Sequence, residues 1–164
     1  GGSIEIRNSG EDGLVVDRGS YVYAPSMVSE ANGRDGVLAT RLGGLYADGG
    51  SFNDNAQRGL AVTLGGQAFV DNATFNDNVA FGVLSTLNGS AWAGSSTANR
   101  NGDHGFQSSG LSYLYCGNCT ASRNSGWGFQ TGNMGYLLTV STSGTGNTSG
   151  LVPGTTASNS WIDR

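Results

Sequence analysis

The sequence contains no lysine, and only 12% of its residues are charged. Long surface helices normally depend on such residues, so this composition argues against a helical protein. Eight arginines against twelve acidic residues give a net charge of −4, which disfavours a nucleic-acid partner. No apolar run approaches the ~18 residues that a transmembrane helix needs, so we expect no membrane insertion.

The sequence is rich in glycine, with 29 residues, and it contains a set of asparagines that recur at a fixed interval. Asn55 and Asn78 end the matching phrases SFNDN and TFNDN, one 23-residue step apart. The same step connects six asparagines: Asn32, Asn55, Asn78, Asn101, Asn124 and Asn147. A glycine column keeps the same period: Gly13, Gly36, Gly59, Gly82, Gly105 and Gly128. A period maintained over so many units indicates a solenoid.

The content of each repeat indicates which solenoid forms. The unit is too short for the two helices of a helical repeat, and its apolar residues alternate as strands require. With the repeated glycine as position 0, apolar residues recur at positions 1 and 3, 9 and 11, and 14 and 16. Three inward-facing pairs per turn describe three short strands. We therefore predict an all-β fold, a single-stranded right-handed parallel β-helix of about seven rungs spaced by ~4.8 Å.

The asparagine column is expected at one corner of this coil. Each side-chain amide can then donate to the amide of the next rung and satisfy backbone groups at the bend. We therefore interpret the six asparagines as a structural ladder rather than a ligand site.

The 23-residue period, the ladder and the phrases DGLVV, DGV and RGLAV together resemble the pectate-lyase-like superfamily of parallel β-helices. That superfamily contains polysaccharide lyases and hydrolases, alginate epimerases and phage tailspikes, and the chain is most similar to a tailspike segment. The resemblance covers residues 4–152. It implies the fold but no single activity, because one such scaffold supports many chemistries.

Three parts are expected along the chain. Residues 1–12 form a partial first rung, residues 13–152 form the β-helix, and residues 153–164 form a C-terminal tail or cap after Pro153, which stops strand pairing. The leading Gly-Gly-Ser is typical of a segment introduced by cloning. Because the coil begins in mid-rung without a capping helix, we expect the natural chain to extend beyond residue 1.

Function is expected on the outward-facing columns. Position 10 lies between two inward positions and has five successive aromatic residues: Tyr23, Tyr46, Phe69, Trp92 and Tyr115. An exposed apolar stripe marks a binding or assembly surface. Two interpretations remain open, a platform for the CH faces of sugar rings and a homotrimer interface. A register shifted by one residue would instead bury the column. Position 2, apolar from Val15 to Leu84, suggests a second contact surface.

Carboxylates provide the enzyme-like signal. Position 12 sets Asp48 and Asp71 in neighbouring rungs, ~5 Å apart and beside the aromatic column. Two such carboxylates repel, which can raise one pKa and create a general acid, as in retaining glycosidases. The competing interpretation is that both aspartates form turns. Asp54 and Asp77 belong to the ladder corner, where arginines such as Arg100 continue the column and neutralise it.

Histidine and cysteine are nearly absent. Asp103 and the single histidine, His104, form a second acid–base candidate because imidazole titrates near neutrality, although the variable column of His104 favours an inert corner residue.

Cys116 and Cys119 flank a predicted corner; two thiols are too few for structural zinc. A corner disulfide and two buried thiols both fit the spacing. No metal and no cofactor are expected.

Two hypotheses follow. The first is a rigid, homotrimeric β-helical segment of a phage tail spike or similar adhesin, extracellular or on the virion tail, that recognises a bacterial surface polysaccharide. The second is a polysaccharide hydrolase or lyase that uses Asp48 and Asp71, or the Asp103–His104 pair. The sequence lacks the Asp, Pro and His signature of alginate epimerases, the clustered aspartates of polygalacturonases and the basic residue of pectate lyases. These absences favour the first hypothesis.

Overall fold

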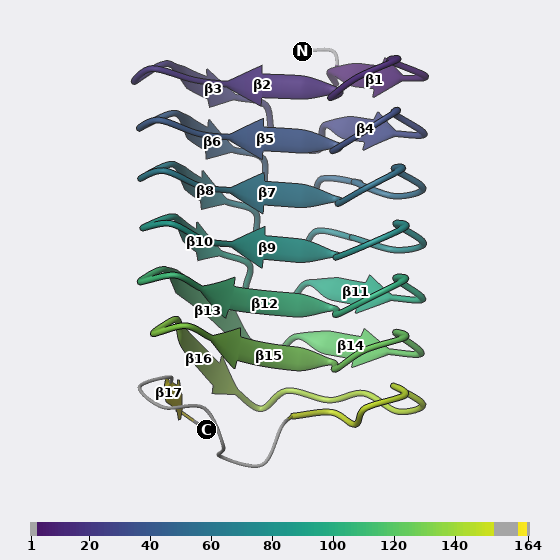
Figure 1. The fold of residues 1–164 in the computed structure, drawn as a ribbon. Helices are drawn as coiled ribbons and strands as arrows, with labels where there is room; N and C mark the ends of the chain where they lie inside the picture. Colours follow the sequence, from purple (N-terminus) through teal and green to yellow (C-terminus); the bar gives the residue numbers. More distant parts are fainter. Residues whose placement is uncertain (1–2, 153–160, 164) are drawn as a thin grey trace.

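The chain forms a parallel β-solenoid whose turns stack along one axis (Figure 1). The computed structural model describes residues 3–152 and 161–163. Strand pairing joins residues that are one sequence repeat apart, as in Leu45 with Ala68 and Ala68 with Ala91. The predicted all-β solenoid and its period are confirmed, with six strands in its most regular sheet where about seven rungs were expected.

Two sheets run the length of the coil, and both use positions where β-branched and aromatic residues recur. Sheet 1 contains β2 (Leu14–Val16), β5 (Val37–Ala39), β7 (Leu60–Val62), β9 (Val83–Ser85), β12 (Phe106–Ser109) and β15 (Phe129–Gly132). Sheet 2 contains β3 (Tyr21–Tyr23), β6 (Gly44–Tyr46), β8 (Gln67–Phe69), β10 (Ser90–Trp92), β13 (Tyr113–Gly117), β16 (Tyr136–Val140) and β17 (Trp161–Asp163). All pairs within them are parallel.

The third sheet is shorter and interrupted. It contains β1 (Glu5–Arg7) paired with β4 (Val28–Glu30), and β11 (Thr97–Asn99) paired with β14 (Thr120–Ser122). Single bridges at Ser51 and Thr74 connect the two pairs. Sheet 3 therefore continues through the middle of the coil with one paired residue per rung.

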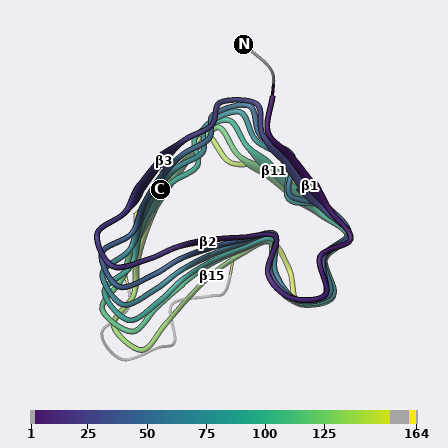
Figure 2. The same cartoon turned by 90° about the horizontal axis from the view of Figure 1, so that it is seen from above.

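Three corners join the sheets and give the coil a triangular cross-section (Figure 2). In the first turn, residues 17–20 join sheet 1 to sheet 2, residues 24–27 join sheet 2 to sheet 3, and residues 31–36 lead back to sheet 1. We call these the first, second and ladder corners. The ladder corner is the longest and projects as a lobe beyond sheet 1 (Figure 2).

Columns of like side chains fill the interior. Phe52 stacks on Phe75 with ring centroids 5.2 Å apart, and Phe106 stacks on Phe129 at 5.3 Å. The two stacks meet edge to face at Phe75 and Phe106. The predicted inward positions are buried in most rungs, and the aromatic residues of position 10 are not part of this core. The predicted register is therefore correct.

The six predicted asparagines form a continuous ladder at the ladder corner. Each Nδ2 donates to the Oδ1 of the next asparagine at 2.9–3.1 Å, from Asn32 to Asn147. The same Oδ1 atoms also accept the backbone N–H of the preceding asparagine. The asparagines from Asn32 to Asn124 are buried, so the ladder satisfies polar groups that water cannot reach.

The two ends of the chain are described in part. In the first rung β1 pairs with β4, and Ile6 packs against the core. At the other end β17 pairs with β16 in sheet 2. Residues 1–2, 153–160 and 164 lie outside the described residues, and so do most of the predicted cloned leader and most of the predicted tail. No helix among the described residues is long and apolar enough to cross a membrane.

Candidate functional site

The predicted aromatic column lies on the outer face of sheet 2. Tyr23 is 66% exposed and Phe69 is 37% exposed, while Tyr46, Trp92 and Tyr115 are half-buried. Each of these residues pairs in register with its counterpart in the next rung. A shift of register that would have buried this column does not occur.

A second aromatic column, at position 8 of the same face, was not predicted. It consists of Tyr21, Tyr113 and Tyr136, separated by Gly44, Gln67 and Ser90 in the intervening rungs. This interruption hid the column from a search for continuous repeats. Together the two columns form an aromatic surface on sheet 2: Tyr21, Tyr23, Tyr46, Phe69, Trp92, Tyr113, Tyr115 and Tyr136.

Most rings of the aromatic surface stack on one another between rungs. Tyr23 stacks on Tyr46 at 4.9 Å between centroids, and Phe69 stacks on Trp92 at 4.6 Å. Trp92 then meets Tyr113 at 5.7 Å, and Tyr113 stacks on Tyr136 at 5.6 Å. Stacked rings cover each other's faces. Tyr115 makes no such ring contact within the described part of the chain.

Tyr115 instead leans towards the second corner, over two glycines. A Cβ atom added to Gly117 would collide with the Tyr115 hydroxyl, and one added to Gly94 would lie 3.3 Å from its Cε1 atom. The same added atom at Gly94 would lie 3.1 Å from Oδ1 of Asp71. The absence of two side chains therefore leaves room for the Tyr115 ring, and Gly94 lies between that ring and the Asp71 carboxylate.

Asp48 and Asp71 lie in neighbouring rungs of the second corner, as predicted, and both accept backbone hydrogen bonds there. Oδ1 of Asp48 accepts the N–H of Asp71 at 3.1 Å, and Oδ1 of Asp71 accepts the N–H of Gly94 at 2.6 Å. Each aspartate therefore satisfies a donor in the following rung. This geometry accounts for both residues as corner formers, and of the two carboxylate oxygens of Asp71 only Oδ1 accepts a hydrogen bond from the described residues.

The electrostatics of this corner follow from these contacts. Burial raises the pKa of Asp71, the Gly94 N–H opposes that shift, and repulsion from Asp48 adds to it. The hydrogen bond from the Tyr46 hydroxyl to Asp48 raises the pKa of Tyr46 to about 12. The predicted repulsion between the two carboxylates is present, but burial is the larger cause.

Asp54 and Asp77 lie on the ladder corner, away from the aromatic surface. Both have positive φ, at 58° and 59°, and so does Arg100 at 56°. The Arg100 guanidinium donates two hydrogen bonds to the Asp77 carboxylate, from Nε to Oδ1 at 2.7 Å and from Nη2 to Oδ2. The column therefore contains the arginine–aspartate neutralisation that its sequence suggested.

Asp103 and His104 also lie on the ladder corner, at the edge of sheet 1, and the structure does not bring them to Asp48 and Asp71. Nδ1 of His104 accepts the backbone N–H of Trp127 at 2.8 Å, while Oδ1 of Asp103 lies 3.2 Å from the same nitrogen. A nitrogen that accepts from Trp127 cannot at once donate to Asp103. The pair is therefore arranged as a corner hydrogen bond rather than as a dyad oriented by its aspartate.

Cys116 and Cys119 form a disulfide at the second corner, with 5.5 Å between their Cα atoms. Both are fully buried. Of the two states that the sequence left open, the structure therefore contains the disulfide. Cys116 directly follows Tyr115, so the bridge closes the turn beside the ring.

The family model described as right handed beta helix region matches residues 3–151. The chain belongs to the right-handed β-helix family. No curated protein matches the sequence significantly.

Among solved structures, this right-handed β-helix is similar to the A-module of mannuronan C-5 epimerase AlgE4 from Azotobacter vinelandii. The two share 15% sequence identity with a TM-score of 0.68, and the match covers 99% of this chain and 58% of that one. The chain thus spans little more than half of the epimerase module. At this identity the similarity extends to the fold alone.

The exposed apolar residues of this right-handed β-helix are concentrated on the first corner rather than at position 2. Ala61 and Leu84 are only 1% and 9% exposed, and they pair in register with each other in neighbouring rungs of sheet 1. The expectation of an exposed apolar surface at position 2 is therefore wrong beyond Val15 and Leu38. Instead, five apolar residues form what we call the leucine corner: Leu42, Leu64, Leu87, Leu111 and Met134.

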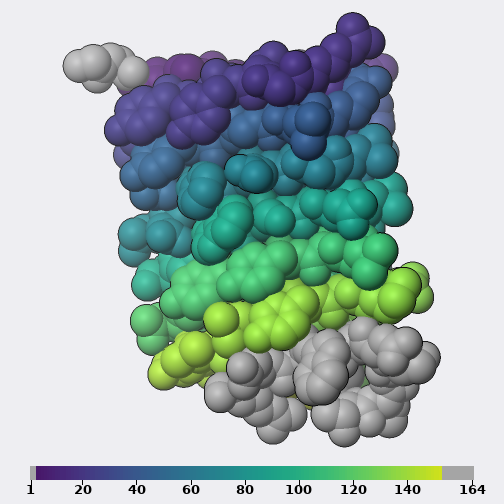
Figure 3. All heavy atoms as spheres, turned by 90° about the vertical axis from the view of Figure 1, so that its left-hand side faces the viewer, coloured from purple at the N-terminus to yellow at the C-terminus, as the bar shows by residue number. Residues whose placement is uncertain are grey.

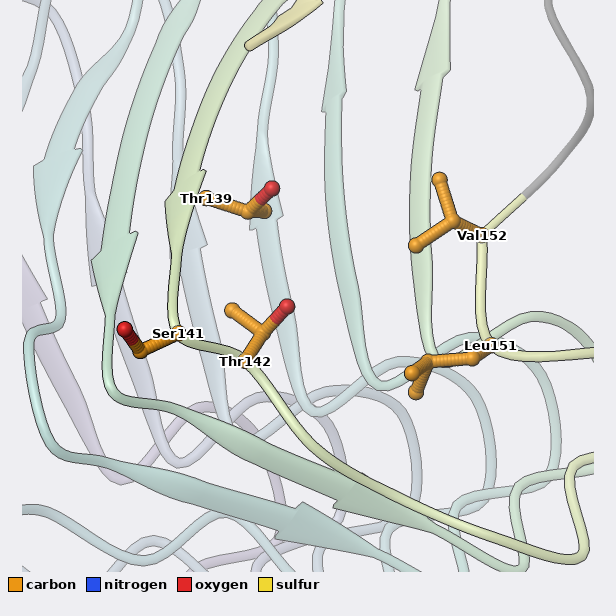
Figure 4. A pocket seen from close by; sticks show the side chains of 5 residues that line it. All are labelled: Thr139, Ser141, Thr142, Leu151 and Val152. Carbon is orange, nitrogen blue, oxygen red and sulfur yellow. The ribbon is translucent and has the colours of Figure 1, made fainter. Parts of the chain in front are cut away.

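Hollows are present on the described surface at the leucine corner and at the last turn. A groove of about 720 Å³ runs along the leucine corner, on the side of the molecule that faces the viewer in Figure 3. A second hollow of about 480 Å³ lies at the last turn, where Thr139 and Thr142 face Leu151 and Val152 (Figure 4). Neither is lined by a titratable side chain. Among the described residues no three His, Cys, Asp or Glu side chains are grouped to hold a metal ion.

Proposed function

We propose that this chain is the polysaccharide-binding shaft of an extracellular surface protein, such as a phage tail spike or adhesin. The observation that supports this best is the aromatic surface of sheet 2, which extends over six rungs with carboxylates at its edge. Aromatic rings pack against the CH faces of sugars, and carboxylates accept hydrogen bonds from sugar hydroxyls. A row of such groups at a constant rung spacing suits a polymer better than a small molecule.

Recognition fits this surface better than catalysis. Asp48 and Asp71 both accept backbone N–H groups of the next rung, and Nδ1 of His104 does the same. Groups that hold corners together are poorly placed to move protons during a reaction. The proposed shaft therefore binds glycans without cleaving them.

A polysaccharide-modifying enzyme is the second candidate. Its support is the raised pKa of Asp71, which suits a general acid, together with a fold similar to that of an epimerase module. In this alternative Asp71 would donate a proton to a glycan bound over Tyr115, with Asp48 as its neighbouring carboxylate.

The proposal extends to assembly and location. A homotrimer would cover the leucine corner, whose five exposed apolar residues are unusual on a monomer's surface. A buried disulfide persists most readily in an oxidising compartment, which fits an extracellular or virion location.

The test combines binding and turnover. The protein is incubated with a panel of bacterial capsular polysaccharides and lipopolysaccharides, and mass spectrometry detects both retained glycan and released oligosaccharides. We expect retention without shortened products, weakened about tenfold by Trp92→Ala and unchanged by Val79→Ala, which removes a 68% exposed apolar side chain from the ladder corner.

Two outcomes would overturn this view. Shortened products that disappear in the Asp71→Asn variant would make the protein an enzyme. A well-folded protein that retains no glycan would leave the aromatic surface without its proposed ligand.

A further inference from the structure

We propose that Tyr115, Asp71 and Asp48 form a subsite for an uncharged hexose unit with two adjacent hydroxyl groups. The proposal rests on the proposed polysaccharide function and adds the chemical class of the ligand: a neutral glycan rather than a uronic-acid polymer.

Tyr115 is the ring of the position-10 column best suited to a sugar. The other rings of its column stack on their neighbours, so their faces are largely covered. The Tyr115 ring lies over Gly94 and Gly117 instead, without a ring contact among the described residues. A pyranose needs one open ring face, because its axial CH groups pack against the negative face of the π-system.

The carboxylates of the same corner supply hydrogen-bond acceptors: Asp71 lies across Gly94 from the ring, and Asp48 lies one rung beyond Asp71. Asp71 uses Oδ1 for the Gly94 N–H, and its other oxygen can accept a hydroxyl. Asp48 accepts the Asp71 N–H and the Tyr46 hydroxyl. Adjacent sugar hydroxyls are donors at a spacing that neighbouring carboxylate oxygens can bridge, and hydrogen bonds to ionised acceptors are the strong ones.

The distribution of positive charge determines the selectivity. Six of the seven described arginines pair with carboxylates of the first corner, the ladder corner or sheet 3: Arg7, Arg18, Arg34, Arg41, Arg58 and Arg100. The seventh, Arg123, shares the ladder-corner column of Arg100. Within the described chain no cation therefore lies on sheet 2 or at the second corner.

A uronate bound over Tyr115 and Gly94 would place its carboxylate close to Asp71, with Asp48 one rung further and no counter-ion. Coulomb repulsion at ~5 Å in a surface environment is large enough to weaken binding about tenfold or more. A primary alcohol at the same ring position has no such penalty and adds a donor for Asp71. The corner therefore selects against charge at this position of the sugar.

The experiment uses matched polymers. Polygalacturonate and alginate are each compared with the product in which their carboxylates have been reduced to primary alcohols, alongside neutral glucans and mannans. Binding is measured by affinity electrophoresis and calorimetry at low ionic strength. We expect at least one neutral polymer to bind, and each reduced polymer to bind about tenfold or more tightly than its parent.

Three variants assign the effect to the subsite. Tyr115→Ala should weaken the binding of the neutral polymer about tenfold. Asp71→Asn keeps an oxygen for the Gly94 N–H, and it should weaken the neutral polymer while improving the binding of polygalacturonate. Asp54→Asn makes the same chemical change on the ladder corner, at a positive φ that asparagine tolerates. It should change the binding of neither the neutral polymer nor polygalacturonate.

The outcomes separate this inference from the proposed function. Equal or tighter binding of the uronic-acid polymers would overturn the inference and leave polysaccharide binding intact. If the neutral polymer no longer binds the Trp92→Ala variant but still binds the Tyr115→Ala variant, the subsite inference is overturned while the proposed polysaccharide binding is retained. Failure of every polymer to bind would overturn the inference, and it would overturn the proposed function as well if no capsular polysaccharide or lipopolysaccharide is retained.

Discussion

At the scale of single residues, side chains accept the backbone N–H groups that the corners leave without a strand partner. Asn101 accepts the N–H of Asn78 and also its Nδ2, at 3.0 and 3.1 Å. Its own Nδ2 donates to the carbonyl of Phe75 and to Asn124. All four bonds lie in the buried interior, where an unmade hydrogen bond is costly.

The Asn101→Ala substitution should therefore lower the free energy of unfolding by about 2–4 kcal/mol, because the backbone N–H and one amide hydrogen of Asn78 lose their acceptor. Chemical denaturation followed by circular dichroism measures the loss. Asn99→Ala provides the matched comparison, since Asn99 is half-buried and accepts one N–H, from Ser122 at 2.8 Å; it should cost about 1 kcal/mol. Equal losses in both variants would contradict the special role of the ladder.

His104 gives a second prediction at this scale, on pH. Burial lowers the pKa of His104 and outweighs the Asp103 carboxylate, which raises it. The unfolded chain, with an ordinary histidine pKa of about 6.5, therefore binds more protons than the folded one in the window just below that value. The free energy of unfolding should fall as the pH falls from 7 to 5.

The single histidine makes this effect easy to isolate. In His104→Asn the side-chain oxygen can accept the Trp127 N–H, as Asp35 accepts the N–H of Arg58 in the same column, and nothing titrates. Thermal unfolding of both proteins between pH 5 and 7 gives the comparison. We expect the wild type to lose stability relative to the variant, and parallel curves would show that His104 is not the cause.

At the scale of the strands, the sequence predicts those features that recur in every rung without interruption. Three-residue strands with two inward side chains produce a strict column with one member per repeat, so the inward positions and the Asn32–Asn147 ladder could be assigned before the fold was known. The same logic identified the column from Tyr23 to Tyr115 as outward-facing. Alternation and period together determine the face of a strand.

What depends on rotamers or on broken columns could not be predicted. Asn53, Asn76 and Asn99 form a second, shorter ladder in which each Oδ1 accepts the N–H of the following rung, but its column changes to other residues at both ends. The lean of Tyr115 over Gly94 follows from the space that two glycines leave, and periodicity contains no information on it. The disulfide of Cys116 likewise depends on corner geometry rather than on spacing alone.

At the scale of the whole molecule, the leucine corner combines two unfavourable features in five successive rungs. Its residues are 49–72% exposed. All five also have positive φ, between 50° and 67°, a conformation that glycine and asparagine adopt far more readily than leucine or methionine. Neither feature stabilises a monomer. Both are understandable if the corner is covered in an assembly of parallel coils, as in the proposed homotrimer.

The triple variant Leu64→Asn, Leu87→Asn and Leu111→Asn should therefore separate folding from assembly. Asparagine relieves the strain of positive φ, so the unfolding free energy should stay within about 1 kcal/mol of the wild type or rise. Sedimentation equilibrium should show a trimer for the wild type and a monomer for the variant. Val79→Asn, which removes a 68% exposed apolar side chain from the ladder corner, should remain trimeric. A wild-type protein that stays monomeric at high concentration would refute the assembly, and a trimer that survives the triple variant would place its interface on another face, such as the aromatic surface of sheet 2.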